Sequence, residues 1–364
     1  MFDVLEVPPR ACNARALVDQ AARVTKVRAR APLRLGFAGG GTDISPYCDT
    51  FGGCVLNATI GMFAHCSIEL RNDWCVKFIA LDHECEIQTA ADAAPPSSEP
   101  FTLHQAVHAR IGRQFLGGTA LPVTVTTASD ASAGSGLGSS STLVVAMVQA
   151  YRELLALPLD EYQVAELAYR IEREDAGLAG GRQDQYAAAF GGINFIEFRG
   201  GQAMVNSLRV RPSVLMELEA MMVLYRTGIS RDSSRIIREQ CNSLHGAEET
   251  ALQAMHQMGR DARVMKEALL QGDLNAFSDI LARGWEAKKR TAAGITTPEI
   301  DRIHELALSA GALAGKVSGA GGGGYLFFLV PPERRPHLLR VLARAPGETR
   351  LCGFSGAGAQ AWRV

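Results

Sequence analysis

The sequence predicts an α+β fold of two domains. The chain has 364 residues, enough to bury a large core and to divide into more than one domain. Strand patterns and helix patterns occur in both halves, without the regular alternation that is typical of a parallel βαβ sheet. We find no internal repeat. Gly200, Gly201 and Pro212 punctuate the middle of the chain, so we expect an extension at 1–25, a first domain at 26–205 and a second at 206–364.

Alternating and β-branched runs predict the strands of the first half, and apolar spacing of three and four predicts its helices. A helix is plausible over 11–24 in the extension. The expected strands are 27–37, 53–60, 63–70, 76–80, 121–127 and 193–198, and the expected helices are 103–116, 142–155 and 159–174.

The second half is richer in helical patterns. We expect strands at 221–225 and 325–330 and helices at 234–249, 252–270, 274–289, 298–310 and 335–345.

The charge balance limits the classes of function. Lys and Arg total 37 against 38 for Asp and Glu, which argues against a general nucleic-acid or membrane-surface binder. No stretch approaches 18 uninterrupted apolar residues, and residues 1–31 lack the core of a signal peptide. We therefore expect a soluble, cytoplasmic protein without a membrane or nucleic-acid partner.

A loop rich in glycine and serine, residues 132–141, is the most informative feature of the chain. Its glycines permit conformations that a Cβ would block. The serines end where a helical pattern begins, so the loop should present unpaired N–H groups at the positive end of a helix. A flexible linker would continue into polar sequence, whereas Leu143, Val144, Met147 and Val148 continue here as a packed helix. We therefore expect the loop to bind a polyphosphate, most plausibly ATP. It lacks the Gly-Lys-Ser/Thr of the common P-loop.

Two further glycine clusters flank this loop in the sequence. Residues 31–43, APLRLGFAGGGTD, read as a strand that runs into a tight turn. Residues 316–324, KVSGAGGGG, lie directly before an apolar strand. Each cluster alone could be only a turn, but three in one chain are harder to dismiss.

With these three motifs in their order and spacing, the sequence resembles the GHMP kinase superfamily from about residue 26 to the C-terminus. The resemblance implies a first domain like the second domain of ribosomal protein S5 and a ferredoxin-like second domain. It also implies ATP and a substrate in the cleft between the two domains.

The resemblance assigns roles to residues of the first domain. Asp184, in the family's Asp-Gln element, would be the catalytic carboxylate, and Arg34 would lie beside it. Ser140 would contact Mg²⁺, with Ser139 as the competing candidate. Glu172, twelve residues before Asp184, would be the second magnesium ligand, with Glu174 as the fallback. The ATP phosphates would be bound by Gly134, Ser135, Gly136, Leu137, Gly138, Ser139, Ser140 and Ser141.

The first motif bears on the acceptor. Where galactokinases have Gly-Glu-His-Thr-Asp, this chain has Gly39 to Asp43, so galactose in the usual pose is in doubt. The wider string resembles the D-glycero-D-manno-heptose 7-phosphate kinases, which phosphorylate the C1 hydroxyl to give the 1,7-bisphosphate for nucleotide-activated heptose. A cationic pocket would then hold the 7-phosphate. The expected acceptor-binding residues are Gly40, Gly41, Thr42, Asp43, Gly321 and Gly322, with Arg231, Lys289 and Arg182 for the phosphate.

Two alternatives stay open at this point. One is a kinase of an unphosphorylated sugar such as fucose, and the other is a galactokinase-like sugar sensor without catalysis. Loss of the aspartate or of the magnesium ligands would favour the sensor, but all are present. The partners expected are ATP and a small sugar phosphate, and the oligomeric state is left open.

Overall fold

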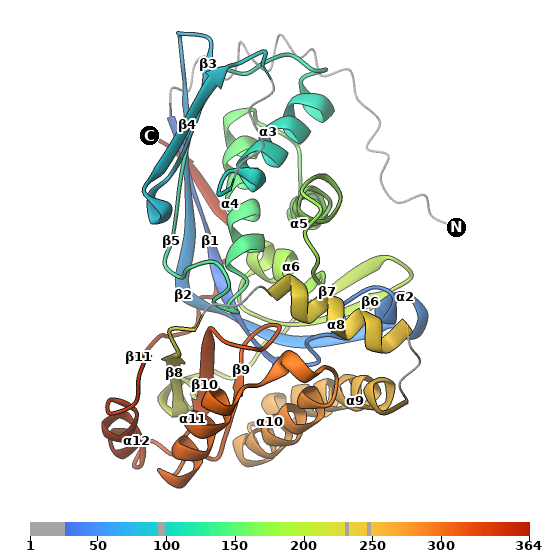
Figure 1. Cartoon of the computed structure of the whole chain (residues 1–364), viewed down its shortest axis with the longest axis vertical. Helices are drawn as coiled ribbons and strands as arrows, with labels where there is room; N and C mark the ends of the chain where they lie inside the picture. The colour runs from blue at the N-terminus through green and yellow to red at the C-terminus, as the bar shows by residue number, and fades with distance from the viewer. Residues whose placement is uncertain (1–25, 94–98, 230–232, 246–248) are drawn as a thin grey trace.

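The computed structural model describes residues 26–93, 99–229, 233–245 and 249–364. The expected helix at 11–24 lies outside these residues. Two sheets lie one above the other along the long axis of the molecule (Figure 1), and helices cover one face of the larger sheet. The mixed α+β prediction is confirmed.

The larger sheet has eight strands, and β2 is its longest. The main path runs β12-β1-β2-β5-β3-β4, and β6 pairs with β2 and with β7. All pairs are antiparallel except β3 with β5. The strands are β1 (Lys26–Ala38), β2 (Gly53–Leu70), β3 (Cys75–Ala80), β4 (Cys85–Ala90), β5 (Val123–Ser129), β6 (Ile193–Arg199), β7 (Gln202–Ser207) and β12 (Gln360–Arg363).

The single strand β2 replaces the two strands expected from the sequence. Its first part, residues 53–58, pairs with β6, and its second part, residues 64–70, pairs with β5. The register against β1 shifts at two points, between Pro32 and Arg34 and between Gly36 and Ala38. Such irregularities bend a strand without ending it, so β2 changes partners while remaining continuous.

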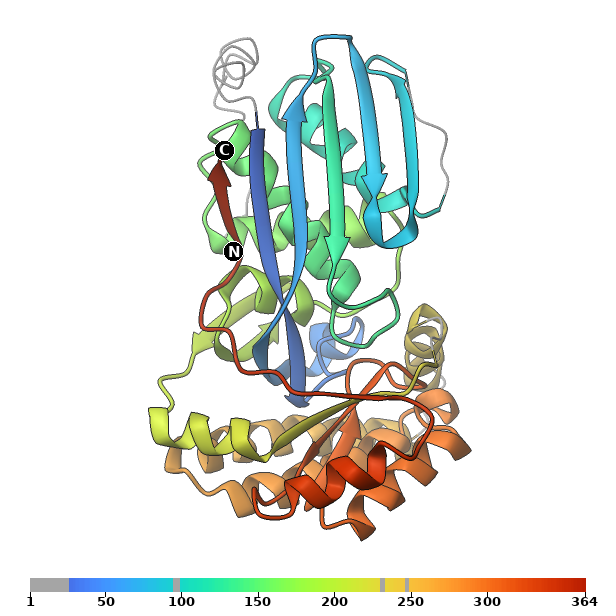
Figure 2. The ribbon, with the colours of Figure 1, turned by 90° about the vertical axis from the view of Figure 1, so that its left-hand side faces the viewer.

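Figure 2 shows the larger sheet from the side opposite its helices. The covering helices are α3 (Thr102–Phe115), α4 (Ser139–Leu154), α5 (Glu161–Arg170) and α6 (Gln183–Phe190), with a five-residue π-helix, Ile171–Asp175, directly after α5. The short α2 (Tyr47–Phe51) and a 3-10 turn at Leu81–His83 lie in connections. Asp160 begins α5 with a capping box, because its side chain accepts from the Gln163 N–H and the Gln163 side chain accepts from the Asp160 N–H.

The second half is built on a four-stranded sheet of order β11-β8-β10-β9. Its strands are β8 (Met222–Arg226), β9 (Ala314–Val317), β10 (Tyr325–Leu329) and β11 (Glu348–Arg350). The helices are α7 (Pro212–Met221), α8 (Ser233–His245), α9 (Glu249–Gln271), α10 (Leu274–Lys289), α11 (Pro298–Ser309) and α12 (Arg335–Leu342), with a 3-10 turn at Ala293–Ile295. The bounds of α10 agree with the sequence prediction, whereas α7 and the short strands β9 and β11 were not predicted.

A hydrophobic cluster joins the two halves. Phe37, near the end of β1, makes edge contacts with Phe277 of α10 and Phe327 of β10 at centroid distances of 5.3 and 5.9 Å. Aromatic pairs of this kind add specific geometry to apolar burial. The C-terminal end of the chain also returns to the larger sheet, because β12 pairs with β1. The predicted boundary at residue 205 falls inside β7, and the division into 26–205 and 206–364 stays a prediction.

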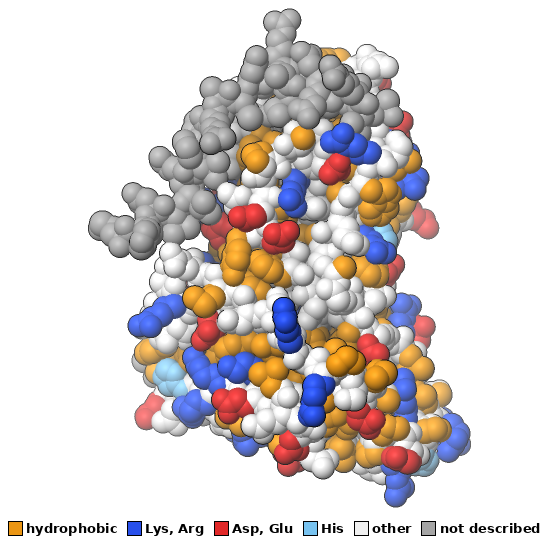
Figure 3. Space-filling view, turned by 180° about the vertical axis from the view of Figure 1, so that it is seen from behind, with side chains coloured by type: hydrophobic (Ala, Val, Ile, Leu, Met, Phe, Trp, Pro, Cys, Tyr) orange, Lys and Arg blue, Asp and Glu red, His pale blue; other side chains and the backbone are white. Residues whose placement is uncertain are grey.

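The surface agrees with the near-neutral charge. Figure 3 shows side chains of both signs spread over one face of the molecule. Within the described part of the chain, no helix combines the length and the apolar character needed to cross a bilayer.

Candidate active site

Three glycines shape the loop between β5 and α4. Gly134, Gly136 and Gly138 have φ angles of 74°, 78° and 77°, in the left-handed region that glycine adopts at little cost. A Cβ on Gly136 would lie 2.3 Å from the carbonyl oxygen of Ser318, so this glycine also lets two loops touch. The loop ends at the N-terminus of α4, where first-turn N–H groups lack helical partners. This arrangement suits an anion.

The serines after the loop form the first turn of α4, which begins at Ser139 and not at residue 142 as expected. Serine competes with a helix when its hydroxyl bonds the nearby backbone. Here the Ser139 hydroxyl donates to the Ser132 carbonyl at 3.2 Å, and Ser140 and Ser141 donate to Glu172. Because these hydroxyls bond to groups outside the first turn, they do not compete with its backbone hydrogen bonds, and α4 can begin at Ser139.

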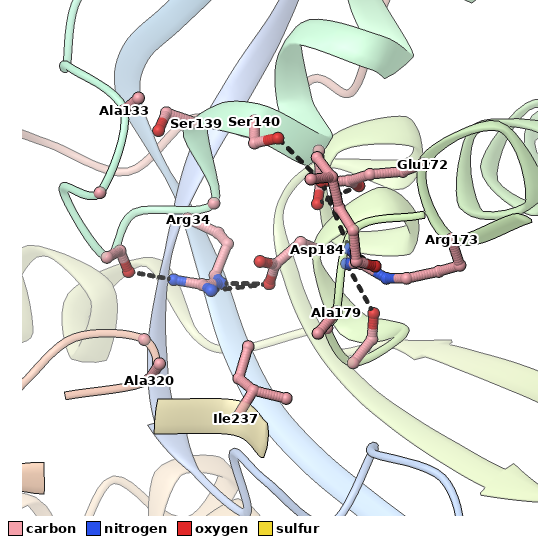
Figure 4. A pocket seen from close by; sticks show the side chains of 18 residues that line it. Arg34, Ala133, Ser139, Ser140, Glu172, Arg173, Ala179, Asp184, Ile237 and Ala320 are labelled. Carbon is pink, nitrogen blue, oxygen red and sulfur yellow. Dashed lines mark hydrogen bonds and ion pairs between the residues drawn. The ribbon is translucent and has the colours of Figure 1, made fainter. Parts of the chain in front are cut away.

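Glu172 lies in the π-helix and is 2% exposed. One carboxylate oxygen accepts from the Ser140 hydroxyl at 2.8 Å, and the other accepts from the Ser141 hydroxyl and the Gln185 amide, both at 2.6 Å. The alternative Glu174 is 58% exposed in its side chain and pairs with Arg110 at 3.2 Å. The structure therefore brings Glu172, and not Glu174, to Ser140 (Figure 4).

Arg34 connects the loop to Asp184. Its Nε and Nη2 each lie 2.7 Å from Oδ1 of Asp184, and its Nη1 donates to the Gly136 carbonyl at 2.6 Å. The Arg34 backbone N–H donates to the Leu137 carbonyl at 3.0 Å. Ser318, which the sequence did not single out, donates to the same Gly136 carbonyl at 2.9 Å. Both contacts from Arg34 to Asp184 go to Oδ1. Oδ2 faces Gly138, where a Cβ would lie 3.3 Å from it.

Asp184 lies where two pockets meet. The larger, of about 450 Å³, is lined by the glycine loop, the start of α4 and the π-helix. The smaller, of about 60 Å³, is lined by the 40–44 turn, Gln183 and Lys288. Ile237 of α8 points into this region opposite Asp184 (Figure 4). Both pockets are lined by Arg34, Gly181, Asp184, Ile237, Gly319 and Ala320.

Asp43 is 1% exposed and holds the start of α6. It accepts from the backbone N–H groups of Gly41, Arg182 and Gln183 and from the Gln183 side chain, at 3.0–3.1 Å. Four donors match the lone-pair sites of a carboxylate. Asp43 lines the small pocket, and its four hydrogen bonds give it a positioning role for the turn that carries Asp184. Thr42 is fully buried and exchanges hydrogen bonds with the Cys54 backbone.

Gly40 borders the smaller pocket from the other side. A Cβ on Gly40 would lie 3.5 Å from the Gln183 amide nitrogen and 3.8 Å from Lys288 Nζ. A long polar side chain at this position would therefore reach into the pocket, and glycine leaves that space open.

Lys288, not its neighbour Lys289, reaches this pocket. Its Nζ donates to the carbonyls of Gly319 at 2.6 Å and Gly40 at 3.3 Å. Lys289 pairs with Glu286 at 2.7 Å and lies over the Trp285 ring, and it lines neither pocket. Leu281, Trp285 and Lys288 are all buried at helical spacing. The apolar face of α10 was thus the sequence signal that could have identified Lys288.

Burial lowers the pKa of Lys288 to about 8. The charges of Asp43 and Asp184 act against this shift, and Arg34 adds to it. A second buried lysine, Lys316 of β9, has its pKa lowered well below the ordinary value by burial and by Lys288 and Arg34. Its Nζ donates to the Phe37 carbonyl at 3.4 Å. Two cations, Arg34 and Lys288, and two carboxylates, Asp43 and Asp184, thus line the small pocket. Lys316 is a further buried cation that acts electrostatically with Arg34 and Lys288.

The remaining predicted residues lie elsewhere. The Arg182 side chain donates to the Gly201 carbonyl and stacks over Tyr169 at 4.7 Å. Gly322 donates to the Ile295 carbonyl at 2.8 Å, and a Cβ on Gly321 would lie 2.7 Å from that oxygen. In the 316–324 cluster, Gly319 and Ala320 line the cleft instead. Arg231 lies outside the described residues.

Comparison with known proteins gives matches along most of the chain. Residues 102–192 match the model of the GHMP kinases N-terminal domain, and residues 265–348 match that of the GHMP kinases C-terminal region. The chain is 41% identical to D-glycero-alpha-D-manno-heptose 7-phosphate kinase of Campylobacter jejuni, over 93% of this chain and 99% of that protein.

Two further matches differ in their sequence identity to this chain. A crystal structure titled as a D-glycero-D-manno-heptose 1-phosphate kinase, from Bacteroides thetaiotaomicron, is 40% identical with a TM-score of 0.79, over 93% of this chain and 99% of that one. L-fucokinase/L-fucose-1-P guanylyltransferase of Bacteroides fragilis is 26% identical over 86% of this chain and 35% of that protein.

Proposed function

The chain belongs to the GHMP kinase family, and from that premise we propose that it transfers the γ-phosphoryl group of ATP to the C1 hydroxyl of D-glycero-D-manno-heptose 7-phosphate. The observation that carries the proposal is the position of Asp184. This carboxylate lies between the glycine-rich loop at an anion-binding helix terminus and a small second pocket. Phosphoryl transfer needs this juxtaposition of a phosphate site and an acceptor site.

The larger pocket fits ATP and Mg²⁺. The loop from Gly134 to Gly138 and the start of α4 would hold the phosphates. No cluster of three or more His, Cys, Asp or Glu side chains suited to a metal occurs in the described ranges. Mg²⁺ commonly takes one or two carboxylates plus substrate phosphates, so Glu172 with the Ser140 hydroxyl is an adequate protein contribution. When bound, Mg²⁺ would neutralise charge on the phosphate oxygens.

The reaction then follows from the residues at the junction. Asp184 Oδ2 would accept the proton of the C1 hydroxyl while the C1 oxygen bonds to the γ-phosphorus. The bond from that phosphorus to the bridging oxygen breaks, and ADP leaves with the electron pair. Arg34 fixes Asp184 through Oδ1 and links it to the loop. The same contacts therefore align the proton acceptor with the phosphate site, which supports catalysis by positioning.

The identity of the acceptor rests on the relatives. The two relatives at about 40% identity are named as heptose phosphate kinases, which supports a heptose phosphate as acceptor, but their names differ in the position of the phosphate. The fucokinase match is distant, and the chain spans about a third of that protein. A sensor without catalysis is not favoured, because Asp184, Arg34, Glu172 and Ser140 are all present in contact with one another or with the loop.

One substrate panel tests the proposal. ADP release would be measured with ATP, Mg²⁺ and each of heptose 7-phosphate, heptose 1-phosphate, unphosphorylated heptose and fucose, with the Asp184→Asn variant as the blank. We expect the 7-phosphate to give the highest kcat/KM and ³¹P spectra to show a new phosphate at C1. Preference for heptose 1-phosphate or fucose would replace the acceptor in the proposal. No ADP release with any sugar would overturn the kinase assignment.

A further inference from the structure

Among the residues that the structure describes, Lys288 has one more hydrogen-bond donor than acceptors. Of the described residues that line the smaller pocket, Arg34 and Lys288 carry positive side chains. Arg34 is committed to Asp184 and the Gly136 carbonyl. The ammonium group of Lys288 has three N–H bonds, and two are accounted for by the Gly40 and Gly319 carbonyls. The third is available to a ligand in the pocket.

The surroundings of Lys288 favour a neutral oxygen over a phosphate. Asp43 and Asp184 act electrostatically on Lys288 from the side of the pocket. A phosphate dianion there would be repelled by both carboxylates. The pocket volume of about 60 Å³ is also small. A sugar hydroxyl can accept from the lysine without adding charge.

We propose that Lys288 is an acceptor-specificity residue that donates a hydrogen bond to a hydroxyl oxygen of the sugar, close to the hydroxyl that receives the phosphoryl group. This inference rests on the proposed function. It places the non-reacting phosphate of the substrate away from Lys288, so that Lys288 recognises the polyol and not the phosphate.

A purely structural role must be distinguished from this one, because Lys288 also links the 40–44 turn to the 319–320 turn. The test variant is Lys288→Met, which replaces a buried charge with an apolar chain of similar length and should fold. Lys289→Met tests the neighbouring position on the same helix. Lys77→Met is the matched control, since Lys77 pairs with Glu86 in β3 and lines neither pocket.

Dissociation constants would be measured by calorimetry for heptose 7-phosphate, for unphosphorylated heptose and for a non-hydrolysable ATP analogue. A lost hydrogen bond to a charged donor is expected to weaken binding by about 10- to 100-fold. Lys288→Met should therefore weaken both sugars by the same factor, with nucleotide binding changed less than twofold. Lys289→Met and Lys77→Met should bind both sugars as the wild type does.

The pH profile provides a second readout, which a structural role would not give. The charged groups that act on Lys288 are Asp43, Asp184 and Arg34, with Lys316 beneath. Since the pKa of Lys288 is about 8, sugar affinity should fall as pH rises from 7 to 9. Lys288→Arg, which stays charged throughout this range, should lose that dependence.

Three results would overturn the inference while the kinase assignment stands. The first is unchanged sugar affinity in Lys288→Met. The second is a loss confined to the phosphorylated sugar, which would assign Lys288 to the phosphate. The third is a parallel loss of nucleotide affinity, which would show a structural role. If the wild type bound no sugar of the panel, both this inference and the proposed function would fail.

Discussion

The two sides of the cleft are built in different ways. The proposed nucleotide side comes mainly from two segments of the first half, the loop and first turn of α4 from residue 132 to 141 and the stretch from residue 172 to 184. The proposed acceptor side is assembled from short segments spread along the whole chain, around residues 40, 183, 288 and 319. A site that is local in sequence can be recognised from sequence, whereas a dispersed one depends on how the elements pack.

Substitution at the junction of the two sides should have the largest effect. Asp184→Asn removes the proposed proton acceptor but keeps the shape of the side chain, so kcat should fall by about 10²- to 10⁴-fold. ATP affinity should change little, because Asp184 faces the loop without forming part of it. Steady-state kinetics and nucleotide titration measure the two quantities. A variant with near-wild-type turnover would remove Asp184 from the mechanism.

Glu172→Gln should be next in magnitude and should affect only the nucleotide side. A neutral amide is a weaker Mg²⁺ ligand than a carboxylate, so the Mg²⁺ concentration for half-maximal rate should rise by about 10- to 100-fold. Acceptor affinity should be retained. The control is Glu174→Gln, whose wild-type carboxylate pairs with Arg110 on the surface. Equal effects of the two substitutions would contradict the assignment of Glu172.

Gly138→Ala should have a moderate effect on kcat/KM. Comparing it with a second glycine substitution separates the effect of backbone strain from that of contact with Asp184. An alanine at the φ of 77° is strained by about 1–2 kcal/mol, and its Cβ would lie 3.3 Å from Asp184. Gly118→Ala is the matched control, with a φ of 84° and no atom within 4 Å of the added Cβ. Chemical denaturation should show similar losses of stability for both. We expect only Gly138→Ala to lower kcat/KM, by roughly tenfold.

The smallest effect on activity at neutral pH should come from the scaffold behind the nucleotide side. Burial lowers the pKa of His104 and of His108, both on α3, to about 4. His108 contacts Tyr151 of α4 at 2.8 Å. Their folded-state pKa values lie below the unfolded value near 6.5, so the unfolded chain binds more protons between pH 6.5 and 4. Stability is therefore fully present above pH 6.5 and is lost on acidification.

Urea denaturation at pH 7 and pH 5 measures this loss, which should be on the order of 1–2 kcal/mol for each histidine. The double variant His104→Gln and His108→Gln should show a much weaker dependence on pH over this interval. A pH dependence as steep as that of the wild type would assign the acid sensitivity to other groups.

The same contrast explains what the sequence could predict. The two-domain GHMP kinase fold, the glycine-rich loop and the bounds of α10 followed from contiguous patterns and from resemblance. The choice between Glu172 and Glu174 followed from the spacing to Asp184 that the resemblance implies, and the two residues face different ways because positions two apart lie on nearly opposite sides of a helix. Which of these residues act in the reaction stays a prediction.

The end of α10 shows what the sequence could not decide. The sequence analysis named Lys289 and not Lys288, and adjacent helical residues point about 100° apart. Only the packing of Trp285 against the second sheet decides which lysine turns inward. The four hydrogen bonds of Asp43 were likewise invisible, because their donors lie mostly some 140 positions away. The pairing of β12 with β1 could not be predicted for the same reason, because the two strands are far apart in the sequence.

That last pairing also bears on synthesis. Gln360–Arg363 forms an edge of the sheet that contains Arg34, with partners more than 300 positions earlier. The N-terminus of a chain leaves the ribosome first. The pairing of β1 with β12 therefore cannot form until nearly the whole of this sequence has been synthesised. Contacts of such long sequence separation form slowly. A shortened chain that ends before this strand would expose the edge of β1 in the nascent protein, where another molecule could pair with it.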